Sequence, residues 1–347
     1  MGNLLYVQDM ERPDLATFAK MTEADLRGYA FSKIFPVITI REKGGKIWVA
    51  PTSLTKARGT KNRSNGSSLS AGEKTPVEVS YTSDRLEGRG VIYESEMHGF
   101  ADMNAAAQAG ATEAGRKVLN LIEYEAAGKV FTSTRLTAKT MLSDHGVLKA
   151  LQGAAKSVRA YGKAALYMSD EAFLKLCDIP EIRRKLELGA KVTGDIAYLA
   201  LNDEKVLATV STLLGFYAIA IFDSDVVGDD YDNYIAVVAI RPEAFGATGD
   251  TVRAIAKSRA MFGAMMVWVP ESAPADEPFT MSQSADRTAK ANYFDAEGWG
   301  VAKPFVAAVA NSGDSTKLDE NGGCVVCKFA DAYTEYAVPV VNVETGT

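Results

Sequence analysis

Cysteine and histidine are scarce in this chain of 347 residues, which has only three Cys and two His. Cys177 stands alone, whereas Cys324 and Cys327 form a single C-x-x-C pair. No secretory signal precedes them, because residues 1–10 have neither a basic start nor a long apolar run. We therefore expect the protein to fold in a reducing, intracellular compartment and not as a disulfide framework.

Long apolar runs and an excess of positive charge are also missing. The longest apolar run, residues 213–222, is far shorter than the ~20 residues that a membrane-spanning helix needs, so we predict a soluble protein with no membrane partner. The net charge is −6, which argues against a protein built to grip nucleic acid by counter-ion release. With 47% hydrophobic and 24% charged residues, the chain can bury a core, and its length indicates roughly two domains.

Complete catalytic and metal-binding motifs are absent as well. Residues 110–117 are spaced like a phosphate-binding loop but lack its Gly-Lys-Ser/Thr ending. Residues 223–228 begin like a calcium-binding EF-hand loop, and Val227 and Tyr234 then occupy positions that need oxygen ligands. Cys324 and Cys327 could supply only half of a zinc site. We predict no cofactor, no metal and no enzymatic activity, and keep an enzyme that uses these two Cys as the rival hypothesis.

One polar stretch is unusually long. Residues 51–75 are rich in Gly and Ser and carry five cations against one carboxylate, a net charge of +4. The flanking residues 46–50 and 77–82 read as strands, because apolar and polar side chains alternate in the second of them. The pattern predicts a long hairpin with a mobile basic tip that either stays solvated or docks on an acidic neighbour. The cations are Lys56, Arg58, Lys61, Arg63 and Lys74.

The strongest helical pattern covers residues 102–130. Apolar side chains recur there at spacings of three and four, Asp102 can cap the start, and Glu113 and Lys117 can form an ion pair one turn apart. A helix of this length is a rod of roughly 43 Å. Many of the apolar positions are Ala, which predicts close packing of one thin face.

Short elements make up the remainder of the pattern. We predict an extended, partly helical arm over residues 1–30, a strand at 35–40 and a turn at 43–46. After a strand predicted at 164–168, we expect two helices. The first is capped by Ser169, and the second begins at Pro180 and ends at the basic residues Arg183, Arg184 and Lys185. Residues 207–214 read as a helix, and further strands are predicted at 217–222, 235–240, 265–269, 323–328 and 337–343.

This order of parts resembles the major capsid proteins of tailed phages with the Hong Kong 97-type fold. The resemblance rests on residues 35–37 entering the hairpin, the tip at 52–75, the helix at 102–130, and the two helices that begin near Ser169 and Pro180. It implies an α+β fold with an N-terminal arm (1–40), an E-loop hairpin (41–95), a peripheral domain with the spine helix (96–158), an axial domain (159–270) and a return through peripheral-domain strands to the C-terminal end (271–347).

The resemblance also implies a function. The chain would be a structural protein that self-assembles through hexamers and pentamers into an icosahedral shell enclosing phage double-stranded DNA, without sequence-specific binding. The E-loop would lie across a neighbouring subunit. A second set of residues would form an acidic loop at the capsomer edge: Asp223, Asp225, Asp229, Asp230 and Asp232.

A scaffolding protein, a portal and a decoration protein are the further partners that the resemblance implies, with assembly in the host cytoplasm and a final place in the virion. An encapsulin-like compartment shell is the alternative within the same fold.

Overall fold

The computed structural model describes residues 10–11, 15, 28–50, 76–137, 139–142, 146–190, 196–269, 271, 278–286, 288–305 and 322–330. The α-helices are α2 (Phe31–Ile34), α4 (Met103–Val130), α5 (Ser133–Thr137), α6 (Val147–Val158), α7 (Asp170–Asp178), α8 (Pro180–Ala190), α9 (Ile196–Asn202), α10 (Glu204–Leu214), α11 (Ser224–Val227) and α12 (Gly249–Ser258). The strands are β1 (Met10–Glu11), β2 (Val37–Ile40), β3 (Gly44–Val49), β4 (Val77–Thr82), β5 (Asp84–Tyr93), β6 (Thr140–Leu142), β7 (Lys163–Ser169), β8 (Ile219–Phe222), β9 (Tyr234–Ile240), β10 (Gly263–Trp268), β11 (Thr280–Asp286), β12 (Ala291–Pro304) and β13 (Cys324–Phe329).

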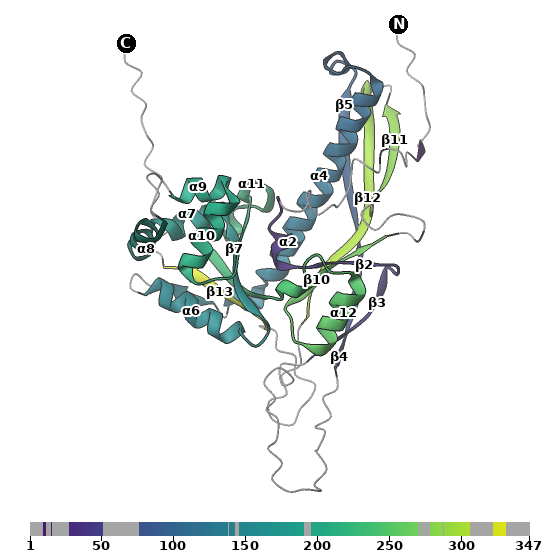
Figure 1. Ribbon diagram of the computed structural model, residues 1–347. Coiled ribbons are helices and arrows are strands. Elements are labelled where there is room, and N and C mark those ends of the chain that lie inside the picture. Colours follow the sequence, from purple (N-terminus) through teal and green to yellow (C-terminus); the bar gives the residue numbers. More distant parts are fainter. Residues whose placement is uncertain are drawn as a thin grey trace, which may run out of the picture.

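A six-stranded sheet is built around β12. Its order is β1-β11-β12-β10-β2, and β5 pairs with the other edge of β12. All of these pairs are antiparallel except β10 with β2, which are parallel. The first part of β12 runs between β11 and β5, and its last part pairs with β10. Figure 1 shows the resulting tall projection, with α4 lying along β5 and β12.

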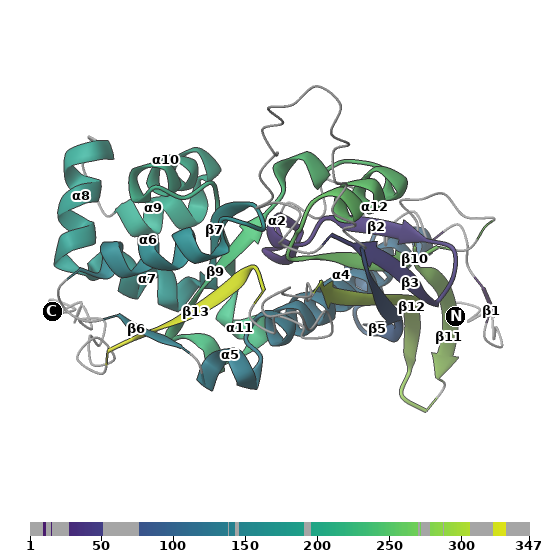
Figure 2. The ribbon, with the colours of Figure 1, turned by 90° about the horizontal axis from the view of Figure 1, so that it is seen from below.

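A five-stranded sheet has the order β6-β13-β9-β7-β8. Its strands are buried on both faces, and alternate residues belong to different hydrophobic clusters. Helices α6 to α10 pack on one face, whereas α2, α4 and α11 contribute to the core on the other face. Seen from below in Figure 2, this helical part lies beside the six-stranded sheet, and α4 runs between the two.

The predicted hairpin is confirmed. β3 and β4 are antiparallel, with Val49 opposite Val77, so the tip begins and ends at the same point of the ladder. The predicted turn at 43–46 is displaced, because Gly44 and Gly45 already belong to β3 and the bend occupies residues 41–43. The tip itself, residues 51–75, lies outside the described residues.

The long helix is confirmed as α4, and Asp102 caps it by accepting a hydrogen bond from the Ala105 amide at 2.8 Å. Lys117 and Glu113 form the expected ion pair at 2.6 Å. Glycine makes the close packing on β5 and β12 possible. A Cβ on Gly90 would lie 2.0 Å from the Gly110 carbonyl oxygen, and one on Gly110 would lie 2.2 Å from the Phe294 ring.

Other predictions divide into confirmed, wrong and missed elements. The strands near 35–40, 164–168, 217–222, 235–240, 265–269 and 323–328 and the helix near 207–214 are present within a few residues. The helix opened by Pro180 does not close at Lys185 but continues to Ala190, because its apolar stripe includes the buried Leu186. Elements α6, α9, α12, β5, β11 and β12 were not predicted.

Residues 337–343, predicted as a strand, lie outside the described part, as does most of the arm at 1–30. Among the helices that the structure describes, none has the length and apolar character to cross a membrane.

Candidate intersubunit surfaces

The base of the hairpin is fixed firmly to the six-stranded sheet. Lys43 places its ammonium group 3.7 Å from the ring centre of Trp299 and 4.6 Å from that of Trp268, and the Trp268 indole N–H donates to the Arg41 carbonyl at 3.0 Å. Cation–π contacts of this kind contribute about 0.5–1 kcal/mol each at exposed sites. The β3–β4 ladder therefore has a defined position on the sheet, and it leaves Trp48 46% exposed.

The five cations predicted at the tip lie outside the described residues, so their contact with a neighbour stays a prediction. They are Lys56, Arg58, Lys61, Arg63 and Lys74.

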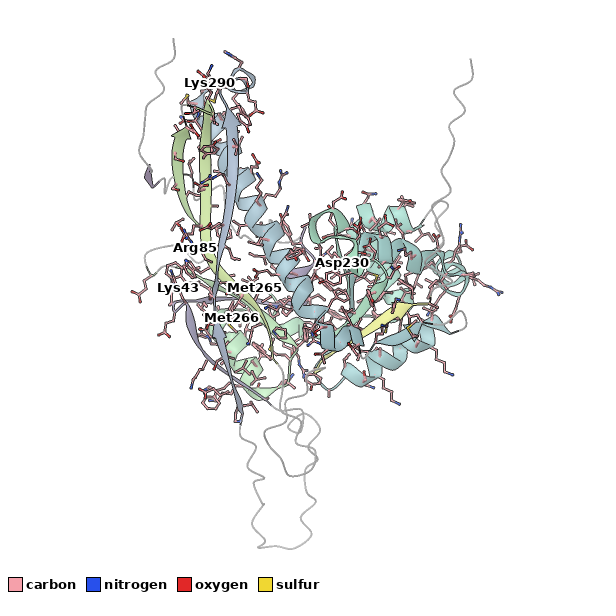
Figure 3. The ribbon with its side chains drawn as sticks, turned by 180° about the vertical axis from the view of Figure 1, so that it is seen from behind. Lys43, Arg85, Asp230, Met265, Met266 and Lys290 are labelled. Atoms are coloured by element: carbon pink, nitrogen blue, oxygen red, sulfur yellow. The ribbon has the colours of Figure 1, made fainter. Side chains whose placement is uncertain are left out.

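The acidic loop follows β8 and is held by hydrogen bonds. Asp223 caps α11 by accepting from the Asp225 amide at 2.9 Å. The buried Ser224 hydroxyl bonds the carboxylates of Asp170 and Asp232, and this anchor was not foreseen from the sequence. Asp223, Asp225, Asp229 and Asp230 are exposed, whereas Asp232 is half-buried. Figure 3 shows Asp230 on the side of the five-stranded sheet that faces α4.

The loop does not have the backbone shape of an EF-hand. Its first residues form the short helix α11 instead of a ligand-bearing turn. In the described part of the chain, no group of three or more His, Cys, Asp or Glu side chains could hold a metal ion. Tyr231 stacks on Phe131 of the α4–α5 connection at 4.7 Å, which ties the loop to the end of α4.

The C-x-x-C pair is split by the sheet. Cys324 and Cys327 are three positions apart on β13, so their side chains leave opposite faces of the strand. Cys324 packs in the core shared with α4, and Cys327 packs under α6 to α10. Burial raises the thiol pKa of Cys324 to about 11 and that of Cys327 to about 12. The two thiols therefore act as small apolar side chains, not as a redox pair or a shared metal site.

A buried carboxylate joins three parts of the chain. Glu123 of α4 accepts hydrogen bonds from the Phe31 amide at the start of α2, at 3.1 and 3.2 Å, and from the Tyr167 hydroxyl of β7, at 3.0 Å. Glu123 is only 2% exposed, and burial raises its pKa to about 7 against the opposing effect of these donors. Sequence reasoning missed it, because nothing near Glu123 in the chain signals its burial.

A charged ladder covers the outer face of β5 and β12. Arg85 pairs with Glu297 at 2.8 Å, and Arg89 makes two bonds to Asp295 at 2.6 and 3.0 Å. Together with β11, the ladder lines a hollow of about 720 Å³. Figure 3 places Arg85 on this face and Lys290 at the far end of the β11–β12 pair. Exposed pairs add little stability, so their main contribution is to fix the register of the two strands.

No family model and no curated protein sequence matches the chain. Solved structures do match its fold. A phage-related protein from Bordetella bronchiseptica superimposes with a TM-score of 0.53 at 13% identity, covering 94% of this chain and 99% of that one. The virus-like particle protein from Pyrococcus furiosus gives a TM-score of 0.49 at 12% identity over 92% and 100% of the two chains. A Mycobacterium phage Bobi chain gives 0.46 at 10% identity over 95% and 94%.

The likeness to the Bordetella protein spans nearly the whole of both chains. The chain therefore has a fold that a phage-related protein also has, and the predicted α+β fold class is confirmed by the helices and sheets of the structure. At such low identity the likeness defines the fold alone.

Proposed function

We propose that this chain is a phage capsid shell protein that assembles through hexamers and pentamers into an icosahedral shell around double-stranded DNA. The observation that carries the proposal is the whole-length fold shared with a phage-related protein. The architecture supports it, because a hairpin with a rigid base and a long polar tip suits a protein that works by contacts between copies.

In this proposal the basic tip is the E-loop and lies across an adjacent subunit. Residues 1–40 act as an N-terminal arm, residues 96–158 as a peripheral domain with α4 as its spine helix, and residues 159–270 as the axial domain. Residues 271–347 return through peripheral-domain strands to the C-terminal end. The chain works as a structural protein in the virion. It assembles in the host cytoplasm with a scaffolding protein, a portal and a decoration protein. The split of Cys324 from Cys327 favours this structural role over the rival enzyme.

Electron microscopy of the purified protein, with mass from light scattering on the same sample, tests the proposal. We expect closed shells, rings or tubes. Deleting residues 54–72 should abolish assembly and leave a folded subunit, because the strands that hold the tip remain intact. Normal shells from the deletion variant would refute the role of the tip. A chain that stays monomeric with its neighbouring gene products present would refute the proposal, and shells filled with protein instead of DNA would identify a compartment shell.

A further inference from the structure

Helix α6 presents an uncompensated basic face. Lys149 and Lys156 are exposed on α6, and the exposed Arg159 follows its last residue, at spacings of seven and three that place the three cations on one stripe. Lys163 at the start of β7 extends the stripe, with its ammonium 4.5 Å from the centre of the Tyr217 ring. The segment 146–163 contains these four cations and no acidic residue. We call these four residues the basic face.

The basic face borders a shallow hollow of about 690 Å³ that is open to solvent. No carboxylate lines this hollow, and within the described residues none of the four cations forms an ion pair. The dipole of α6 accounts in part for Lys156 and Arg159, which lie in and just after its last turn. It does not account for Lys149 in the first turn or for Lys163 on the neighbouring strand.

The acidic loop carries the opposite charge on the opposite side of the same sheet. Its residues 223–232 contain five Asp and no cation. The buried side chains of α6 belong to the core on one face of the five-stranded sheet, and Val227 of α11 belongs to the core on the other face. In Figure 2, α6 lies above the strands of this sheet and α11 lies below them. Because the sheet separates them, the two charged surfaces of one copy cannot meet.

We propose that the basic face of one copy binds the acidic loop of a second copy of this chain. The inference rests on the proposed function, since it identifies which surfaces meet when subunits form a ring. Charge complementarity supports it. The four cations have no acidic partner among the residues that the structure describes, and they would meet the four exposed carboxylates of Asp223, Asp225, Asp229 and Asp230. The loop is preorganised by Ser224 and by the Tyr231–Phe131 stack, so little conformational entropy is lost on binding.

The placement of the two surfaces also fits a ring. A contact that joins two different surfaces of identical subunits is heterologous, and repeating it generates either a closed ring or an open helix. Both hexamers and pentamers are closed rings of this kind. The same contact can serve both, because long flexible Lys and Arg side chains tolerate small changes of angle between neighbours.

Charge reversal tests the inference. The basic-face variant is Lys156→Glu/Arg159→Glu, and the acidic-loop variant is Asp229→Lys/Asp230→Lys. The control is Lys205→Glu/Lys257→Glu, which makes the same change in net charge at two exposed cations away from the basic face. Circular dichroism and urea unfolding check each subunit, and light scattering with electron microscopy measures the assembled fraction at low and moderate salt.

We expect each reversed variant to lose assembly by at least about tenfold, because like charges then face each other. The control should assemble like the wild type. A chain carrying both reversals should recover assembly, since the attraction is restored with its direction exchanged. Added salt should weaken the wild-type contact.

Normal assembly of the basic-face variant, or no recovery in the combined variant, would overturn the inference. So would a basic-face variant that forms normal shells but no longer retains duplex DNA, because the face would then belong to nucleic acid. These results leave the proposed function standing, whereas a wild-type chain that never assembles removes both.

Discussion

Replacing Glu123 by Gln should change how the stability of the subunit depends on pH. The carboxyl group is buried, and its pKa is about 7 in the folded chain against 4.5 for an exposed Glu. Between these values the folded chain holds a proton that the unfolded chain has lost. The free energy of unfolding must therefore fall as pH rises through this interval, which is the reverse of the usual behaviour of a salt-bridged carboxylate.

The size of the effect follows from the two pKa values. Each unit of difference between the pKa in the folded chain and the pKa in the unfolded chain is worth about 1.4 kcal/mol. Ionisation of Glu123 should therefore lower the free energy of unfolding by about 2–3 kcal/mol between pH 5 and pH 8. The Phe31 amide and the Tyr167 hydroxyl limit the cost by donating to the ionised form, and Lys33 of α2 acts in the same direction. Gln keeps the shape of the side chain but cannot ionise.

The assay is urea unfolding of wild type and Glu123→Gln at pH 5 and pH 8. Other titrating groups are common to both proteins, so they cancel in the comparison. The variant should lose about 2–3 kcal/mol less than the wild type over this range. Gln can leave the Phe31 amide or the Tyr167 hydroxyl unsatisfied, which shifts the free energy of unfolding of the variant at both pH values by about 1–3 kcal/mol without changing their difference. Equal pH dependence in the two proteins would refute the reasoning.

Three further predictions concern helix packing, a buried hydrogen bond and thiol chemistry. Gly110→Ala should lower the free energy of unfolding by about 1–3 kcal/mol, because the added Cβ would clash with the Phe294 ring. Gly128→Ala in the same helix is the control: its Cβ meets no neighbouring atom, so it should raise the free energy of unfolding by about 0.5–1 kcal/mol. Urea unfolding measures both variants. Tyr167→Phe should cost about 1–3 kcal/mol and raise the pKa of the buried carboxyl group further, which moves the pH-dependent loss to higher pH. In native protein, Cys324 and Cys327 should react with thiol reagents far more slowly than in urea, and oxidants should not join them; mass spectrometry would detect either departure.

Local signals in the sequence were enough for the elements that depend on local chemistry. The Asp102 and Ser169 caps, the Glu113–Lys117 pair and the alternation in 77–82 each depend on residues at most a few positions apart. The polar composition of 51–75 marked the end of the β3–β4 ladder for the same reason.

Contacts between residues far apart in the chain could not be predicted from such local signals. Glu123 looks like an ordinary polar position of α4, and its partners Phe31 and Tyr167 are 92 and 44 residues away. Strand β12 was missed because its buried and half-buried residues alternate through Gly and Ala, which give a weak hydrophobic pattern. The basic face was missed with α6, although its four cations were present in the sequence. Their significance depends on the sheet that separates them from the acidic loop.

The order in which the strands pair has a consequence for synthesis of the chain. β5 pairs with β12, about 200 residues later in the chain, and β2 pairs with the distant strand β10. β6 joins the five-stranded sheet only through β13, at residues 324–329. The six-stranded sheet cannot close before residue 304 has left the ribosome, and the five-stranded sheet cannot close before residue 329, so we expect folding to depend on non-local pairing and to be slow. A nascent chain that ends before β13 therefore lacks a complete five-stranded sheet, and under the proposed function it could not yet offer the axial-domain surfaces to a second copy.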